Sequence, residues 1–139
     1  MTKSTQPMAL RLGLWIAQLL VGIPFVMIGF MKLTTPIPEL AKMIPWAGQL
    51  PVLFVRSIGL VDIAGGVGIV LPALTRIRPG LTVWAAAGCV ALQVCAIIFH
   101  LSRGEGAFTP LNFVFLALAG FVYWGRLTLA PVNRGEVPT

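Results

Sequence analysis

Asp62 is the residue whose position most strongly suggests chemistry, because it is a carboxylic acid inside a long apolar run. On a helix that begins near Val52 it would lie about 15 Å deep, near the middle of a membrane. A carboxylate at that depth is costly unless it is paired or protonated. Two interpretations remain open: Asp62 is functional, or it is a neutral side chain that hydrogen-bonds a neighbouring helix.

A second charged residue, Arg56, lies six residues earlier in the same run. At that spacing the two side chains point to different faces of a helix and do not pair within it. Arg56 would lie about 6 Å from the outer edge of the membrane, where a long side chain can extend its charge to the interface. Arg56 is therefore predicted to reach the interface or, like Asp62, to find a partner on another helix.

His100 is the only histidine, and it ends the third apolar run. It is either a hydrogen-bonding cap or part of a ligand site, and one histidine cannot form a metal site. Gln93 lies two helical turns deeper on the same face. The polar residues expected in the outer half of the membrane or at its midplane are Lys32, Arg56, Asp62, Gln93, His100, Glu105 and Asn112. If they converge, they form a polar pocket open to the outer side, where Asp62 and His100 could exchange protons.

The two cysteines, Cys89 and Cys95, lie in one apolar run. Their spacing matches neither a CxxC redox pair nor a metal site. Six residues correspond to about 600° on a helix, so the thiols point in different directions. Both are predicted to act as small apolar packing residues.

The composition requires a solvent other than water around most of the chain. Of its 139 residues, 58% are hydrophobic and 10% are charged, whereas a soluble domain has about 25% charged residues. The net charge of +6 does not indicate nucleic acid, because the basic residues are scattered and form no stripe for a phosphate backbone. The chain is predicted to be one transmembrane domain, residues 1–139.

Four apolar runs are long enough to cross a bilayer, which takes about 20 residues. They cover about 12–31, 52–71, 81–101 and 108–125. Backbone in lipid must satisfy its own hydrogen bonds, and the runs lack the alternation of a barrel strand, so they are predicted to be helices. The fold class is therefore an all-α, integral membrane four-helix bundle. The first run is interpreted as a retained helix, because it is too long for a signal peptide and has no cleavage site before Lys32.

The basic residues at the ends of the runs predict the orientation. Lys3, Arg11, Arg76, Arg78, Arg126 and Arg134 fall on one side, and Lys32, Lys42, Arg56 and Arg103 on the other. The richer side is expected to be cytoplasmic, which places both termini in the cytoplasm.

The connections and the small residues complete the predicted architecture. Residues 72–80 and 102–107 form short turns, whereas the proline-rich connection 32–51 could contain one or two amphipathic helical turns near 39–44. Spans two and three contain many glycines and alanines. Such residues allow close helix packing in lipid, so most of them are assigned to the bundle and not to a ligand cleft.

The sequence resembles the DoxX-like family of small bacterial four-helix membrane proteins. The resemblance is carried by residues 59–77 (GLVDIAGGVGIVLPALTRI) and 95–105 (CAIIFHLSRGE), by the opening with Trp15, Gln18, Gly29 and Lys32, and by the segment from Asn112 to Arg126. The ordered set is more specific than any one part: Gly-x-x-Lys, an acid in span two, His-Leu-x-x-Gly-Glu, then Asn.

The resemblance implies a set of site residues, a redox context and a location in a bacterial inner membrane. The matching polar positions are Lys32, Asp62, His100, Glu105 and Asn112. Members of the family usually have Glu in span two, and Asp62 is one methylene shorter. The family is named for a subunit associated with an archaeal terminal quinol oxidase and a thiosulfate:quinone oxidoreductase.

Three hypotheses of function follow. In the first, the protein is a subunit of a membrane redox or respiratory complex that binds a quinone or another small lipophilic ligand through Asp62, Gln93 and His100, with any redox centre supplied by a partner or by the quinone. In the second, it is a non-enzymatic assembly or stress-related module in which the polar cluster joins the helices. The third is a small proton-coupled transporter, which would require a homo-oligomer. The first two differ in whether Lys32, Asp62 and His100 line a cavity or pair tightly without one.

Overall fold

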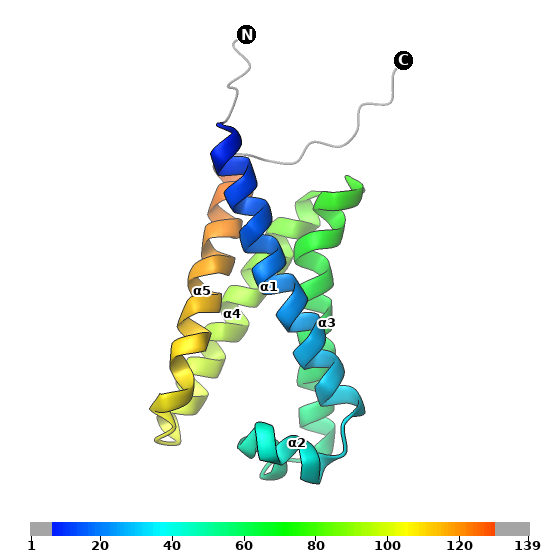
Figure 1. Ribbon diagram of the computed structural model, residues 1–139, viewed down its shortest axis with the longest axis vertical. Coiled ribbons are helices and arrows are strands. Elements are labelled where there is room, and N and C mark those ends of the chain that lie inside the picture. The colour runs from blue at the N-terminus through cyan, green and yellow to red at the C-terminus, as the bar shows by residue number, and fades with distance from the viewer. Residues whose placement is uncertain (1–6, 130–139) are drawn as a thin grey trace.

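The structure is a computed structural model that describes residues 7–129, and every element within that range is a helix (Figure 1). Four helical segments are long and apolar enough to cross a membrane: Met8–Thr34, Val52–Thr75, Gly80–Ser102 and Gly106–Leu129. The all-α four-helix prediction is confirmed. Lys3 and Arg134, which contribute to the charge bias, lie outside the described residues.

The chain forms four long helices with short helices between them. In order these are α1 (Met8–Thr34), α2 (Ile37–Met43), the 3-10 turn η1 (Pro45–Gly48), α3 (Val52–Thr75), α4 (Gly80–Ser102), the 3-10 turn η2 (Gly106–Phe108), α5 (Thr109–Trp124) and the π-helical turn η3 (Gly125–Leu129). The amphipathic segment expected near residues 39–44 is α2. Prolines precede or open α1, α2, α3 and α5. Proline lacks a backbone N–H, and at a helix start this costs no hydrogen bond because the first N–H groups have no acceptor within the helix.

One predicted boundary was wrong. We expected Pro72 to begin the turn after span two, but α3 continues through it to Thr75 and ends at Arg76, which is left-handed with φ 57°. Proline removes one N–H from the helical ladder without reversing the chain direction. Because Pro72 lies only one turn before the end of α3, the helix gives up one backbone hydrogen bond there and still continues to Thr75.

Helices α1 and α3 approach each other so closely that their backbones touch. A Cβ built on Gly29 would lie 2.6 Å from the carbonyl oxygen of Gly59, and one on Gly66 would lie 2.7 Å from that of Gly22. In lipid no hydrophobic effect drives helices together, so such close backbone contact supplies much of the attraction. Gly59 and Gly66 of span two therefore serve the α1–α3 contact, whereas a Cβ on Gly68 would lie 2.9 Å from that of Ala85 on α4. Both contacts fit the close helix packing predicted from the small residues.

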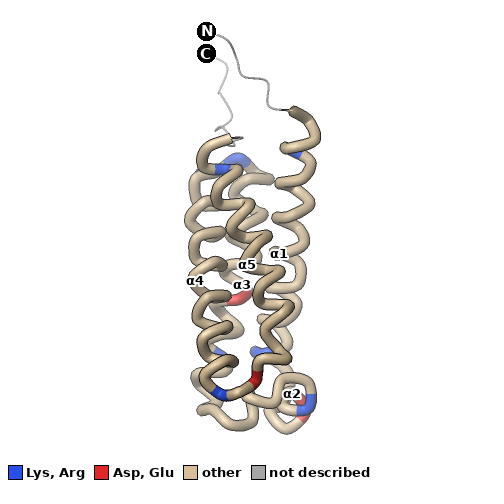
Figure 2. The backbone as a smooth tube through the Cα atoms, turned by 90° about the vertical axis from the view of Figure 1, so that its left-hand side faces the viewer, with Lys and Arg blue, Asp and Glu red and all other residues tan. Residues whose placement is uncertain are grey.

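The bundle has a closed end and an open end. We call the end where α1 begins at Met8 and η3 ends at Leu129 the terminal end, and the opposite end the α2 end. Helix α1 runs obliquely: it lies beside α5 at the terminal end and beside α3 at the α2 end, so α1 and α5 diverge (Figure 1). Charged residues gather mainly at the two ends of the bundle (Figure 2).

The larger buried core cluster fills the closed part of the bundle. It consists of Ala17, Val21, Phe25, Ile69, Ala86, Cys89, Phe115, Ala119 and Val122. A smaller cluster of Leu40, Ala47 and Val55 packs α2 and η1 against α3. Phe25 of α1 and Phe115 of α5 meet edge to face, with ring centroids 5.4 Å apart. This aromatic pair marks the point at which the packed core stops, since both rings also border the cavity described next.

Candidate functional site

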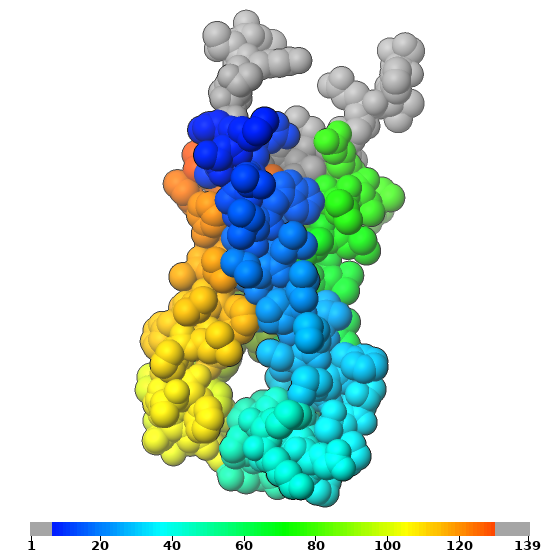
Figure 3. All heavy atoms as spheres, viewed as in Figure 1, coloured from blue at the N-terminus to red at the C-terminus, as the bar shows by residue number. Residues whose placement is uncertain are grey.

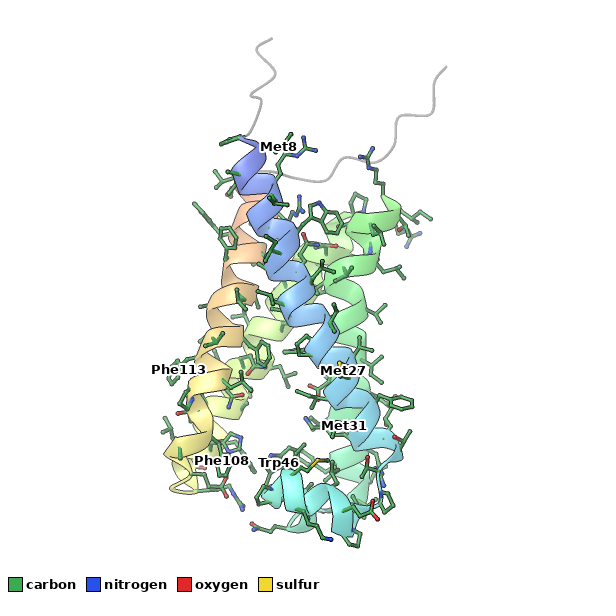
Figure 4. The ribbon with its side chains drawn as sticks, in the orientation of Figure 1. Met8, Met27, Met31, Trp46, Phe108 and Phe113 are labelled. Carbon is green, nitrogen blue, oxygen red and sulfur yellow. The ribbon has the colours of Figure 1, made fainter. Side chains whose placement is uncertain are left out.

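A cavity of about 410 Å³ lies between the diverging helices at the α2 end. All four long helices contribute to it, and residues 43–46 of α2 and η1 close it from below. In Figure 3 the surface is open between α5, α1 and α2. Trp46 and Phe108 lie on the two sides of the lower part of this opening, whereas Phe113 points away from it (Figure 4). The opening faces sideways, toward the lipid that would surround the helices.

The lining is mostly apolar and aromatic, with a small number of polar groups. Six of the seven polar residues singled out from the sequence border the cavity: Lys32, Asp62, Gln93, His100, Glu105 and Asn112. The structure thus brings together residues from α1, α3, α4 and α5 that are up to 80 positions apart in the chain.

Arg56 is the seventh residue, and it does not border the cavity. Its guanidinium donates to the carbonyl oxygens of Lys32 at 2.5 Å and Thr35 at 2.9 Å. The last carbonyls of a helix lack helical donors, and a cation stabilises them. Arg56 therefore joins the end of α1 to α3 through backbone carbonyls, which is the partner on another helix that the sequence left open.

Asp62 finds its partner on another helix, as the sequence required. Lys32 of α1 donates to Asp62 Oδ2 over 2.7 Å, and the two side chains are only 10% and 8% exposed. The Lys32 ammonium also lies 5.4 Å from the centre of the Trp46 ring. Tight pairing was expected for the assembly module and a cavity for the ligand-binding subunit. Both occur here, because the Lys32–Asp62 pair is tight and also borders the cavity.

His100 belongs to a second polar group, which lies on the opposite wall. Its Nδ1 is 3.0 Å from Glu105 Oε2, and Arg103 Nε donates to Glu105 Oε1 at 3.1 Å. Arg103 also donates to the Gln49 side chain just after η1, which links the wall to the cap. The hydrogen bond with His100, assisted by Arg103, holds the pKa of the Glu105 carboxyl below its usual value. Glu105 is therefore a carboxylate at neutral pH and an acceptor for His100.

Among the polar residues that border the cavity, Gln93 has no hydrogen-bond partner within residues 7–129. It is 6% exposed, and its Oε1 is buried with no hydrogen bond in the described chain. Leaving such a group unbonded costs about 1–3 kcal/mol. A buried amide that borders a cavity and lacks a protein partner is what a ligand site requires.

Asn112 contributes a weakly held amide to the same space. Its Nδ2 lies 3.5 Å from the carbonyl oxygen of Phe108, one turn earlier in the chain. That distance is beyond the usual 2.7–3.2 Å range of N–H···O bonds. The side chain is therefore free to turn toward an occupant of the cavity.

The two cysteines differ in environment, and the prediction that both are packing residues was wrong for one of them. Cys89 is buried in the core, but Cys95 is exposed and borders the cavity. The sequence correctly indicated that the thiols point in different directions, but not which direction would meet an open space. Within residues 7–129, no cluster of three potential metal ligands occurs.

A buried polar cluster at the terminal end was not predicted from the sequence. Gln18 of α1 donates to the carbonyl oxygen of Ile69 on α3 at 2.7 Å, and Arg126 of η3 donates to Gln18 Oε1 at 2.8 Å. Arg126 is 5% exposed and lies 5.2 Å from the centre of the Trp15 ring. We had interpreted Arg126 as the interfacial end of span four. The available signal was Trp15 and Gln18, which are three residues apart on one face of span one and offer a cation both a ring and an acceptor.

Comparison with known proteins assigns a family but no activity. The profile described as the DoxX-like family matches residues 16–122, which is most of the chain. Searches of curated proteins and of solved structures found no significant match. The matched range contains both the cavity residues and Gln18.

Proposed function

The chain belongs to the DoxX-like family of multi-pass membrane proteins, and we propose that it binds a small lipophilic molecule in the cavity at the α2 end. The observation that carries the proposal is the unbonded Gln93 amide, buried in the wall of a cavity of about 410 Å³. Ligand sites typically have about 300–1,000 Å³, a mostly apolar lining and a small number of polar groups. This cavity fits that description.

A ring with a polar substituent and an apolar tail suits the shape of the site. The ring would lie among the aromatic side chains of the lining, and its polar substituent would reach Gln93, Asp62 or His100. The tail would leave through the sideways opening between α1 and α5 into the bilayer (Figure 3). A quinone has these features, and it is the ligand we propose on the strength of the family resemblance.

We place this binding in a membrane redox or respiratory assembly. Electron transfer would then use the quinone itself or a centre in a partner subunit. The distribution of basic residues supports cytoplasmic termini, and the bacterial inner-membrane location is proposed from the family resemblance. The α2 end and its cavity would face the periplasmic side.

A second candidate function is that of a membrane assembly module with a structural polar cluster. The tight contact between Lys32 and Asp62 favours it, because a buried ion pair that joins α1 to α3 needs no ligand to explain it. The unbonded Gln93 oxygen favours the binding function, because a buried amide oxygen without a hydrogen bond does not join helices and therefore adds nothing to a structural cluster.

Mass spectrometry of lipids bound to the purified protein tests the choice. We expect a specific small lipophile to copurify with the wild type and to be lost in Gln93→Leu. The matched control is Gln18→Leu, which changes the other buried glutamine at the terminal end. It should keep the ligand even where its stability falls. If none of the three proteins carries a specific lipophile, the binding function is wrong and the assembly module takes its place.

A further inference from the structure

We infer that the cavity selects ligands whose polar end donates a hydrogen bond, such as a ring hydroxyl, and that His100 Nε2 is the group that accepts it. The inference rests on the proposed function, since it concerns the same cavity. It adds that the ligand donates a hydrogen bond and names the protein atom that accepts it.

Glu105 determines which nitrogen of His100 carries the proton. The Glu105 carboxylate can only accept, so the Nδ1 atom 3.0 Å away must be the protonated nitrogen. In a neutral imidazole the other nitrogen then has a lone pair and no hydrogen. His100 borders the cavity and turns Nδ1 to Glu105, which leaves Nε2 as an acceptor for an occupant.

The charged donors near the cavity already have acceptors. Lys32 directs its ammonium to Asp62, and Arg56 donates to the carbonyls at the end of α1. Arg103 is bonded to Glu105 and Gln49. A ligand carbonyl would therefore have to compete for these charged donors with contacts made within the protein, and the amides of Gln93 and Asn112 remain to donate to it.

The acceptors around the cavity are less committed. Asp62 uses Oδ2 for Lys32, and no hydrogen bond to its Oδ1 is formed within residues 7–129. Gln93 Oε1 is also unbonded. An amide can rotate to present either its oxygen or its NH₂ group, so Gln93 accommodates a hydroxyl without selecting it. His100, with its tautomer held by Glu105, makes the selection.

The surroundings of His100 suit a hydroxyl on an aromatic ring. Phe99 and Phe108 lie beside the imidazole, with ring centroids 5.4 and 5.9 Å from it. Trp46 lies across the opening from Phe108 (Figure 4). Trp46 also meets Phe99 edge to face, with ring centroids 5.8 Å apart. A ligand ring in this opening would lie beside this row of aromatic side chains and could place its hydroxyl at His100. For a quinone and its reduced form, the inference favours the quinol, which has the hydroxyls.

A matched pair of probes tests the inference: a long-chain 4-alkylphenol and its methyl ether, which differ by one hydrogen-bond donor. Cys95 supplies the readout, because this thiol is exposed and borders the cavity, whereas Cys89 is buried. The rate at which an uncharged maleimide labels Cys95 is measured in nanodiscs against increasing probe. We expect the phenol to protect Cys95 at about tenfold lower concentration than the ether, since losing the donor leaves a buried acceptor unbonded.

Two variants assign the preference to His100. His100→Phe should reduce the difference between the probes to less than about twofold. Glu105→Gln keeps the imidazole but no longer imposes one tautomer, because an amide can donate or accept. It should therefore also weaken the preference, and it covers the case in which His100→Phe does not fold.

The outcomes separate the inference from the proposed function. Equal protection by the phenol and the ether in the wild type would overturn the inference while the cavity remained a binding site. A preference unchanged in Glu105→Gln would remove the role of the fixed tautomer. Protection by neither probe would count against both the inference and the proposed function.

Discussion

The two buried glutamines, Gln18 and Gln93, have opposite hydrogen-bonding states. Gln18, at the terminal end, uses both halves of its amide, on Ile69 and on Arg126. Gln93, at the α2 end, is almost as deeply buried and its oxygen is unbonded. Burial alone therefore does not tell what a polar residue in a membrane helix does. At the terminal end Gln18 is bonded within the chain, although the Thr82 hydroxyl near the start of α4 is buried there without a partner in residues 7–129. At the α2 end the unbonded Gln93 oxygen lies on the wall of a cavity.

The path of α1 explains why the two ends differ. At the terminal end α1 contacts the last span, where a Cβ on Gly125 would overlap Leu14. At the α2 end the glycine contact at Gly29 and Gly59 holds α1 against α3. Since one straight helix cannot follow α5 and α3 over its whole length, a gap opens between α1 and α5 (Figure 1).

The largest expected effect comes from breaking the ion pair at the cavity. Asp62→Leu or Lys32→Met alone should destabilise the protein by about 3–5 kcal/mol, because each leaves an uncompensated buried charge. The double variant should recover most of that loss. Thermal unfolding in detergent and a double-mutant cycle measure the coupling. Additive losses in the double variant would show that the two residues do not depend on each other.

The next effect concerns the contact that opens the gap. Gly29→Ala places a methyl group 2.6 Å from a backbone oxygen that cannot move aside, so we expect a loss of about 1–3 kcal/mol. Gly120→Ala is the matched control, since its Cβ would meet nothing within 4 Å and should be neutral or slightly stabilising. Similar melting temperatures for the two variants would mean that the α1–α3 backbone contact is not close.

The comparison of the two glutamines can be tested directly. Gln18→Leu removes two hydrogen bonds and a buried acceptor, so it should cost about 1–3 kcal/mol. Gln93→Leu removes an amide that has no partner, so the ligand-free protein should be equally stable or slightly more stable. Unfolding of delipidated samples measures both. A larger loss of stability for Gln93→Leu than for Gln18→Leu would contradict the assignment of Gln18 as the bonded glutamine and Gln93 as the unbonded one.

The smallest effect is a pH dependence from Glu105. Because the folded state lowers its pKa below the ordinary 4.5, the carboxylate stabilises the folded state above that pH. This contribution should be lost as the pH falls from about 4.5 through the lower folded value. Melting temperatures of the wild type and Glu105→Gln should therefore differ at pH 7 and converge at acid pH. A constant difference across this range would contradict the assignment.

Local sequence patterns predicted most of the fold. The four helices, the amphipathic segment that became α2 and the cross-helix partner required by Asp62 all follow from hydropathy and from the cost of a charge in lipid. The end of α3 was misplaced because a proline was taken as a boundary. The cluster at Gln18 was missed because Arg126 was interpreted only as a flanking charge.

The sequence by itself determined that the chain is an all-helical membrane protein and that a charged residue inside a span needs a partner on another helix, because backbone and charge must both be satisfied in lipid. It also predicted which polar residues share one level of the membrane. Only the tertiary structure decided which of them pair, which face a cavity and which do not. Those outcomes depend on the directions of side chains from four helices, and these directions follow from the crossing of α1 over α3 and α5, a long-range contact that no local pattern contains.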